Sequence, residues 1–476
     1  MNMQYLPEKI FKSGFSFLKK TVAVSLIFFT SVLSAESYTL ETLTENLLKN
    51  NPDIRTAQEE YNRSVLDYKD ALGGMGPKID LQISATYMVN PPVGSLSVNV
   101  DDILNAVSWP SGTKPTQTGR YVKIYDGMEN TYYNFGLTLT QPLWTWGKLH
   151  NAAKLYKEVS NIQEIKLEYT EQKLKTELET RIITLMFLNK INEILEEEKI
   201  LAEELVSYSE DAEKSGMLLH QDVVDARIQA KELDIAKQGV SEQITNQILE
   251  LQRITGIEEL SFEQIDYSFN TSLITEIMNA DKNELQEKAL SGTQPSLKMV
   301  TQAKVIQDLA VKISKNSVYW KPDVGFEMSA GYGGSRFPFT EPNWARKDDY
   351  SLNLSLGVKT TVWDGGKKLN DVARSLSNAE SAQINSDATR STIRKTFMEQ
   401  WNTFDVCTMK IEYQDLKIET AASKIQHQEV LFQNGYGSKA DLLSAQIDQC
   451  NEKIERLQQE LSRAAACMTI RFLCSE

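Results

Sequence analysis

Three segments from the first half of this chain recur in the same order in the second half, and this duplication constrains the fold more than any other feature. NNPDIRTAQ, from Asn50, matches GTQPSLKMVTQ, from Gly292, and FGLTLTQPLWTWGK matches LNLSLGVKTTVWDGGK. SGMLLHQDVVDAR matches NGYGSKADLLSAQ at the same offset as the second pair, 219 residues. We therefore predict two copies of one structural unit, residues 36–282 and residues 283–476.

Each copy contains two segments in which apolar and polar residues alternate. In the first segment, Ile79, Leu81 and Ile83 alternate with Asp80 and Gln82. This period of two predicts strands with one apolar and one polar face, at about residues 79–89, 133–143, 323–333 and 350–363. In a soluble protein the apolar face would cover a core. In an outer-membrane barrel it would face lipid, and strands of about 9 to 11 residues would cross the membrane.

Four strands cannot close a barrel, and lipid does not tolerate an open sheet edge. If these strands cross a membrane, several chains must contribute their strands to one closed barrel. Two chains would form an eight-stranded barrel that side chains fill, whereas three would form a twelve-stranded barrel with a wider lumen. We therefore predict a homotrimer, with outer loops at residues 90–131 and 334–349.

Proline-free stretches rich in Glu, Lys, Gln, Leu and Ala follow the second strand of each copy, at about residues 148–214 and 367–434. At 1.5 Å per residue, each would form a helix of roughly 100 Å, which is too long for a compact domain. Shorter helices are predicted at about residues 52–73, 219–255, 295–319 and 438–472. The two short helices of one copy add up to roughly 90 Å, so they can stack end to end beside the long helix.

Both long helices end at a glycine, Gly216 or Gly435, and an aspartate follows six residues later, Asp222 or Asp441. A glycine with positive φ commonly ends a helix, and the helix dipole favours an acid in the first turn of the next helix. We predict two helical hairpins whose tips lie far from the strands.

The N-terminus predicts export. Four lysines precede the apolar run TVAVSLIFFTSVL and the small-residue site SAES, as in a signal peptide that occupies residues 1–35 and is cut after Ala35. No later stretch approaches the length of a membrane-spanning helix. The net charge of -14 argues against nucleic acid as a partner.

All four cysteines lie near the C-terminal end of the chain, without the spacing of a metal site. If the second hairpin turns near residue 437, Cys407 and Cys467 lie about equally far from its tip on opposite arms. We hypothesise a disulfide between them, which requires Cα atoms within about 7 Å.

Together these features resemble the TolC family of outer-membrane efflux channels, over essentially the whole exported chain. The matching segments are NNPDI, QPLWTWGK, VWDGGK and, as the family's hairpin-tip motif, GMLLHQDVVDAR. The resemblance implies a mainly helical chain with a membrane part, in which a trimeric 12-stranded β-barrel continues into a periplasmic α-helical barrel. It also implies contact with outer-membrane lipid, a periplasmic adaptor, and an inner-membrane pump of the RND, ABC or MFS type.

By position, the resemblance implies that the tips meet the adaptor or gate the pore. The adaptor-docking residues would be Gly216, Met217, Leu218, Asp222, Gly435 and Tyr436, and the pore gate would include Asp441 and Lys439. Asp441 matches the first of two acidic rings found in some members, but Ser444 occupies the second position. Gly437 stands where a basic gating residue is often found. Both aspartates can equally be ordinary acids at a helix start.

Trp144, Trp146 and Trp363 lie at strand ends. Tryptophans at such positions are typical of the aromatic girdle at a membrane interface. Packing at the junction of strand and helix is an equally open alternative.

The predicted function is passive. The chain would form the outer-membrane exit duct of a tripartite efflux or type I secretion system, and conduct substrate from pump and adaptor to the exterior. The chain has three histidines and no HExxH, phosphate-loop or nucleophile-elbow motif, which predicts no enzyme activity, no metal site and no cofactor. The alternative function is that of a structural or adhesive coiled-coil envelope protein, which would leave the amphipathic strands unexplained.

Overall fold

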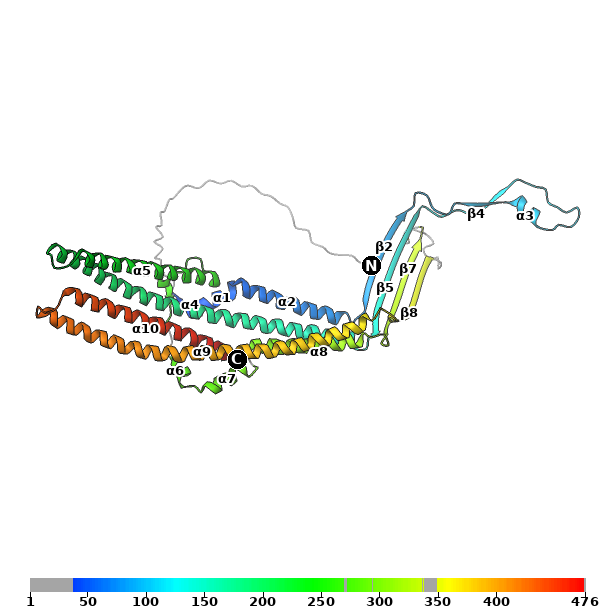
Figure 1. Cartoon of the computed structure of the whole chain (residues 1–476). Coiled ribbons are helices and arrows are strands. Elements are labelled where there is room, and N and C mark those ends of the chain that lie inside the picture. The colour runs from blue at the N-terminus through cyan, green and yellow to red at the C-terminus, as the bar shows by residue number, and fades with distance from the viewer. Residues whose placement is uncertain (1–36, 269–271, 293, 336, 338–348, 475–476) are drawn as a thin grey trace, which may run out of the picture.

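The computed structural model describes residues 37–268, 272–292, 294–335, 337 and 349–474 (Figure 1). The expected signal peptide lies outside the described residues. The helices are α1 (Leu40–Asn50), α2 (Pro52–Gly73), α3 (Val100–Ala106), α4 (Lys148–Lys214), α5 (His220–Thr255), α6 (Ser272–Asn279), α7 (Lys282–Leu290), α8 (Pro295–Asn316), α9 (Lys367–Gln433) and α10 (Lys439–Cys474). The strands are β1 (Tyr38–Thr39), β2 (Lys78–Tyr87), β3 (Leu96–Asn99), β4 (Tyr121–Tyr125), β5 (Thr131–Trp144), β6 (Ile265–Asp266), β7 (Asp323–Gly334) and β8 (Tyr350–Lys359).

Equal helix lengths appear in the two halves of the chain. The long helices α4 and α9 have 67 residues each, α5 and α10 have 36 each, and α2 and α8 have 22 each. α2 and α5 both pack on α4, whereas α8 and α10 both pack between α4 and α9. Figure 1 shows each short pair following one long helix, nearly end to end. The helices thus form one elongated layer. The division at residues 282 and 283 stays a prediction.

Local sequence explains where the helices begin. Pro52 and Pro295 occupy the first helical turns of α2 and α8, where the missing N–H costs no hydrogen bond. The Asn51 side chain caps α2 by accepting hydrogen bonds from the backbone N–H groups of Asp53, at 2.9 Å, and Ile54, at 3.4 Å. The predicted starts therefore hold, although α8 ends at Asn316, three residues earlier than expected.

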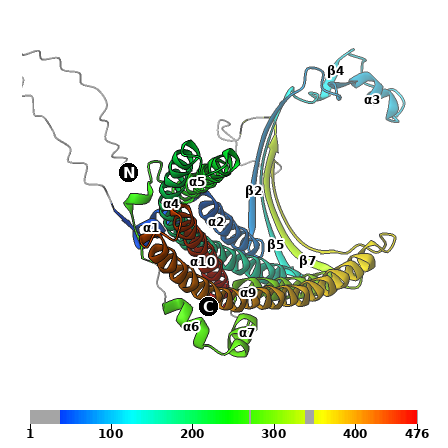
Figure 2. The same ribbon diagram turned by 60° about the vertical axis from the view of Figure 1, so that its left-hand side comes forward.

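Four strands form an antiparallel sheet in the order β2-β5-β7-β8. Its register places Leu81 opposite Leu137, Leu137 opposite Ala330, and Ala330 opposite Leu352. The predicted apolar faces of the four strands therefore combine into one face. On this face, Leu81 of β2 is 67% exposed and Leu356 of β8 is 68% exposed. Nothing in the described chain therefore covers the face at the two edge strands. Figure 2 shows the sheet curving away from one end of the helix layer.

The fourth strand is shorter than predicted. β8 ends at Lys359 rather than near residue 363, because Lys359 pairs with Asp323, the first residue of β7. Beyond that point no partner strand remains. Thr360 instead donates its hydroxyl to the backbone oxygen of Tyr319, at 2.7 Å.

Small elements that the sequence did not predict surround the middle of the layer. β1 and β6 form a parallel pair, and α1 packs on α4 and α5. α6 and α7 lie outside the layer against α10, and α7 also contacts α9 (Figure 2). Two buried clusters join these elements to the long helices. One includes Leu43, Leu47, Leu178, Ile182 and Leu251, and the other includes Ile277, Ala289, Phe397, Cys467 and Ile470.

The connection between β2 and β5 is structured. Residues 88–130, which we call the outer arm, contain the antiparallel pair β3-β4 and helix α3. The arm extends past the end of the sheet, away from the long helices (Figure 1). Within the described residues, no helix is long and apolar enough to cross a membrane.

We expect Phe397→Ala to lower the free energy of unfolding by about 3–5 kcal/mol, because it opens a cavity in a packed cluster. Phe397 is completely buried and stacks on Trp401, with ring centroids 6.0 Å apart. Denaturant unfolding of the purified protein measures the change. Ile200→Ala, at a side chain that is 60% exposed, serves as the control. Equal losses in both variants would contradict this account of the core.

Candidate functional site: the hairpin tips and the seam between the hairpins

The first tip turns at a glycine, as predicted. Gly216 has φ +74°, and the N–H of Met217 donates to the oxygen of Ala212, at 2.8 Å, which closes the end of α4. Met217 is 71% exposed, Leu219 is 72% exposed, and Leu218 is half-buried. The tip thus presents apolar side chains to solvent. Leu219 also belongs to this surface, although it is not one of the docking residues that the resemblance implies.

A contact between histidine and a carboxylate and an ion pair brace the first hairpin. Nδ1 of His220 lies 2.8 Å from Oε1 of Glu213, and Nη2 of Arg227 lies 2.6 Å from Oε1 of Glu210. Both pairs join α4 to α5 near the turn. Because the partners are largely exposed, each pair fixes geometry more than it adds stability.

The second tip has the same backbone turn with different side chains. Gly435 has φ +77°, and the N–H of Tyr436 donates to the oxygen of Leu431, at 2.9 Å. Tyr436 is 85% exposed. At Gly437 a Cβ atom would lie 2.9 Å from Cβ of Leu431 and 3.0 Å from the backbone nitrogen of Phe432. A basic side chain at this position would therefore require the turn to shift.

The two tip aspartates differ. Asp222 accepts a hydrogen bond from the N–H of Leu219, at 2.9 Å, and so caps the start of α5. Asp441 also lies in a first helical turn, but it is exposed, and no hydrogen bond or ion pair is found for its side chain within the described chain. Asp222 therefore acts as a helix-start acid. The Asp441 carboxylate is available to solvent.

Lys439 links the two hairpins rather than standing free. Its ammonium group forms an ion pair with Glu204, which lies on α4. Beside this pair, Leu443 and Ile447 of α10 pack with Leu195 and Leu205 of α4. The second tip is thus attached to the first hairpin through the start of α10. Ser444, on the next turn, is half-buried.

One buried carboxyl interrupts this seam. Glu198, on α4, is 1% exposed, and its Oε2 atom has no hydrogen-bond partner within the described residues. Burial raises the pKa of Glu198 to about 7, and a hydrogen bond with Asn451 on α10 opposes that rise. A coiled-coil seam repeats at intervals of three and four residues, as do Ile191, Leu195, Glu198 and Ala202. An acid at such an apolar position is the sequence signal that could have revealed this buried carboxyl.

The tryptophans take two different roles. Trp146 donates its indole N–H to the oxygen of Pro322, at 2.8 Å, and stacks edge-on against Trp144, with centroids 6.0 Å apart. These contacts favour packing at the junction of strand and helix for Trp146. Trp144 is 58% exposed and Trp363 is 80% exposed, so their side chains are available to a membrane interface.

The hypothesised disulfide is wrong, because all four cysteines are free thiols. Sγ of Cys407 lies 3.8 Å from Oε1 of Gln459, eight residues before Cys467 on α10. Eight helical residues span about 12 Å, so Cys467 lies too far along the helix. Counting residues from a turn near residue 437 therefore gives the wrong register between α9 and α10.

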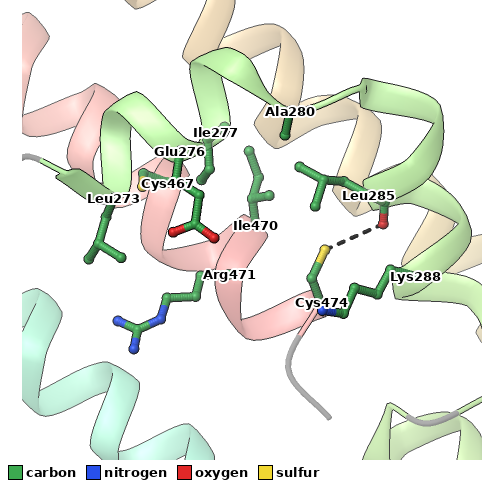
Figure 3. Close-up of a pocket in the computed structure, with 10 residues that line it drawn as sticks. All are labelled: Leu273, Glu276, Ile277, Ala280, Leu285, Lys288, Cys467, Ile470, Arg471 and Cys474. Atoms are coloured by element: carbon green, nitrogen blue, oxygen red, sulfur yellow. Dashed lines mark hydrogen bonds between the residues drawn. The ribbon is translucent and has the colours of Figure 1, made fainter.

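Cys467 and Cys474 instead face a pocket of about 240 Å³ between α6, α7 and the end of α10 (Figure 3). Sγ of Cys474 lies 3.4 Å from the backbone oxygen of Leu285. Burial raises the pKa of each thiol to about 11, so little thiolate exists at neutral pH. These thiols are packing residues rather than nucleophiles.

Comparisons with known proteins identify this architecture. The sequence family described as "Outer membrane efflux protein" matches residues 43–257. This match covers the first structural half of the chain. Together with the fold, it places the chain in the outer membrane, with its helices in the periplasm, and supports the role of an efflux channel. The structural or adhesive alternative is not favoured.

Solved structures share the fold of this chain. The Campylobacter jejuni CmeC outer membrane channel is 13% identical over 92% of this chain and 86% of that chain, with a TM-score of 0.68. A membrane protein from Pseudomonas aeruginosa is 13% identical over 92% and 93%, with a TM-score of 0.70. The outer membrane protein VceC from Vibrio cholerae is 14% identical over 90% and 95%, with a TM-score of 0.65. At such identities the likeness concerns the fold alone. A comparison with curated protein sequences finds no match.

We expect Asp222→Ala to loosen the start of α5, because the N–H of Leu219 loses its acceptor. The amides of residues 219–222 should exchange with deuterium roughly fivefold faster. Asp441→Ala is the control, because Asp441 occupies the matching position of the second tip but accepts no backbone hydrogen bond within the described chain. This variant should leave amide exchange at the second tip unchanged. Faster exchange in both variants would contradict the difference between the tips.

We expect Glu198→Gln to stabilise the protein above neutral pH. Because the folded state raises the pKa from an ordinary 4.5 to about 7, it binds more protons than the unfolded state between these values. Stability from this group is therefore complete below about pH 4.5 and is lost as pH rises toward 7. The variant should gain on the order of 1–3 kcal/mol at pH 8 and little at pH 5. Unfolding across pH, with the exposed Glu197→Gln as control, measures this; a gain that does not vary with pH would contradict it.

Proposed function

We propose that three copies of this chain close into a passive exit duct, which a periplasmic adaptor and an inner-membrane pump supply with substrate. The observation that carries the proposal is the four-stranded sheet, which has one apolar, exposed face and two edge strands, β2 and β8, that lack an outer partner in the sheet. An apolar sheet face suits lipid, but lipid excludes free edges. Three copies in a ring would pair β8 of each with β2 of the next and yield twelve strands.

The helix layer has matching open sides. α2 leads into β2 at one edge, and β8 leads into α9 at the other. On α9, Val406, Met409, Tyr413 and Leu416 are 44–64% exposed, at the three-and-four spacing of a coiled-coil seam. On α5, Ile228 is 50% exposed and Ile235 is 72% exposed. These stripes would become buried between neighbouring subunits, so one ring would close sheet and helices together.

The tips form the proposed entrance. The apolar residues Met217 and Leu218, with Tyr436 from the second turn, would meet the adaptor beside the turning glycines Gly216 and Gly435. Three copies of Asp441 would ring the opening, and the Lys439 pair with Glu204 would hold each second hairpin closed. Trp144 and Trp363 would lie at the membrane interface. The pump would be of the RND, ABC or MFS type.

Conductance in planar bilayers tests the duct. We expect the wild-type trimer to conduct with a preference for cations, because three carboxylates face the entrance. Asp441→Ala should lower the cation preference by about half or more. Asp448→Asn, an exposed and ion-paired acid on the same helix, should leave it unchanged. Folded protein that remains monomeric would contradict the duct, and a conducting trimer with equal selectivity in all variants would contradict the acidic ring.

A further inference from the structure

The outer arm is a built structure rather than a loose loop. Both oxygens of the Asp101 carboxylate, which is 7% exposed, accept backbone hydrogen bonds, from Thr118 at 2.8 Å and Gly119 at 2.6 Å. The N–H of Val100 donates to the oxygen of Arg120, at 2.8 Å. These bonds fix α3 against the ribbon formed by β3 and β4. The arm therefore holds its side chains in defined positions.

The arm nevertheless leaves apolar side chains in water. Tyr121 is 71% exposed, Ile124 is 60% exposed and Leu96 is 56% exposed. A two-stranded ribbon is marginally stable by itself and requires a further apolar surface to pack on. Within the described chain β3 and β4 pair only with each other, and the helix that contacts β3, α3, has only seven residues, so much of the ribbon remains uncovered.

The two faces of the ribbon differ in chemistry. Val98 pairs with Val122, and Leu96 pairs with Tyr125 on the same face, on the far side of a register shift at Ile124. Lys123 lies on the opposite face and forms an ion pair with Asp126, at 2.8 Å. The face formed by Leu96, Val98, Val122 and Tyr125 is therefore the one that requires a partner.

Position favours another copy of the arm as that partner. The ten residues of β2 suffice to cross a membrane, so the arm that continues from it lies beyond the lipid. The arm is rooted on β2, the sheet edge at which neighbouring subunits would meet, and its base is closed by a 2.6 Å bond from the N–H of Met88 to Asn130. Three arms held at one height by the same ring would have a high effective concentration.

Charge agrees with self-association. Residues 88–130 contain four acidic and three basic residues, so copies of the arm repel one another little. We propose that the outer arms of the three subunits pack against one another through the face formed by Leu96, Val98, Val122 and Tyr125, as a collar around the outer mouth. This inference rests on the proposed trimer.

Chemical crosslinking of the full chain tests the collar. Val122→Cys and Lys123→Cys are matched variants, because the two side chains are adjacent, are 50% and 52% exposed, and lie on opposite faces. With a short bismaleimide, we expect Val122→Cys to yield covalent dimers and trimers at least about fivefold faster than Lys123→Cys, since proximity sets the rate. The native cysteines are mostly buried, so wild-type protein should give little product.

A double variant, Leu81→Cys with Leu354→Cys, separates this inference from the trimer itself, because the two residues lie on the edge strands β2 and β8. Crosslinks between those edges without any between arms would overturn the collar and leave the duct intact. Equal crosslinking of Val122→Cys and Lys123→Cys would also overturn it, since that result indicates random collision. Protection of position 122 from a monofunctional maleimide without crosslinking would assign the face to lipid or polysaccharide instead.

Discussion

The free edges of the four-stranded sheet are the constraint on which the rest of the molecule depends. An edge strand presents a row of unpaired N–H and C=O groups, and each such group costs several kcal/mol in hydrocarbon. A sheet whose apolar face suits lipid therefore cannot remain a single copy. Because β2 and β8 continue directly into the outermost helices of the layer, closing the sheet also closes the helices. In the proposed ring of three copies, membrane insertion and assembly of the periplasmic tunnel would therefore be one event.

The two halves of the chain repeat a backbone but not its side-chain chemistry. Both tips turn at a glycine with positive φ, yet one aspartate caps a helix while the other faces solvent. Glu198 interrupts a seam that is otherwise apolar, at the place where the first hairpin contacts the second. Duplication therefore supplies a symmetric frame, and a few polar substitutions within it make the second hairpin different from the first.

Much of the fold could be predicted because its signals are local. Prolines that start helices, glycines that end them and strict alternation in strands depend on neighbouring residues alone, and the observed elements lie close to the predicted ranges. The short elements α1, α6 and α7 escaped prediction because their length is too small for a clear period. β8 is shorter than its alternating pattern predicts, because a strand ends where its partner strand ends. No local pattern in the sequence carries that information.

The sequence by itself determined the lengths of the helices and the apolar face of each strand, since periodicity and order along the chain carry that information. Tertiary structure alone decided which residues from distant helices meet. It placed Cys407 opposite Gln459 instead of Cys467 and joined Lys439 to Glu204. Among the residues that the structure describes, it left one oxygen of Glu198 without a hydrogen-bond partner. Such contacts depend on the register between helices, where a shift of about 1.5 Å per residue exchanges one neighbour for another.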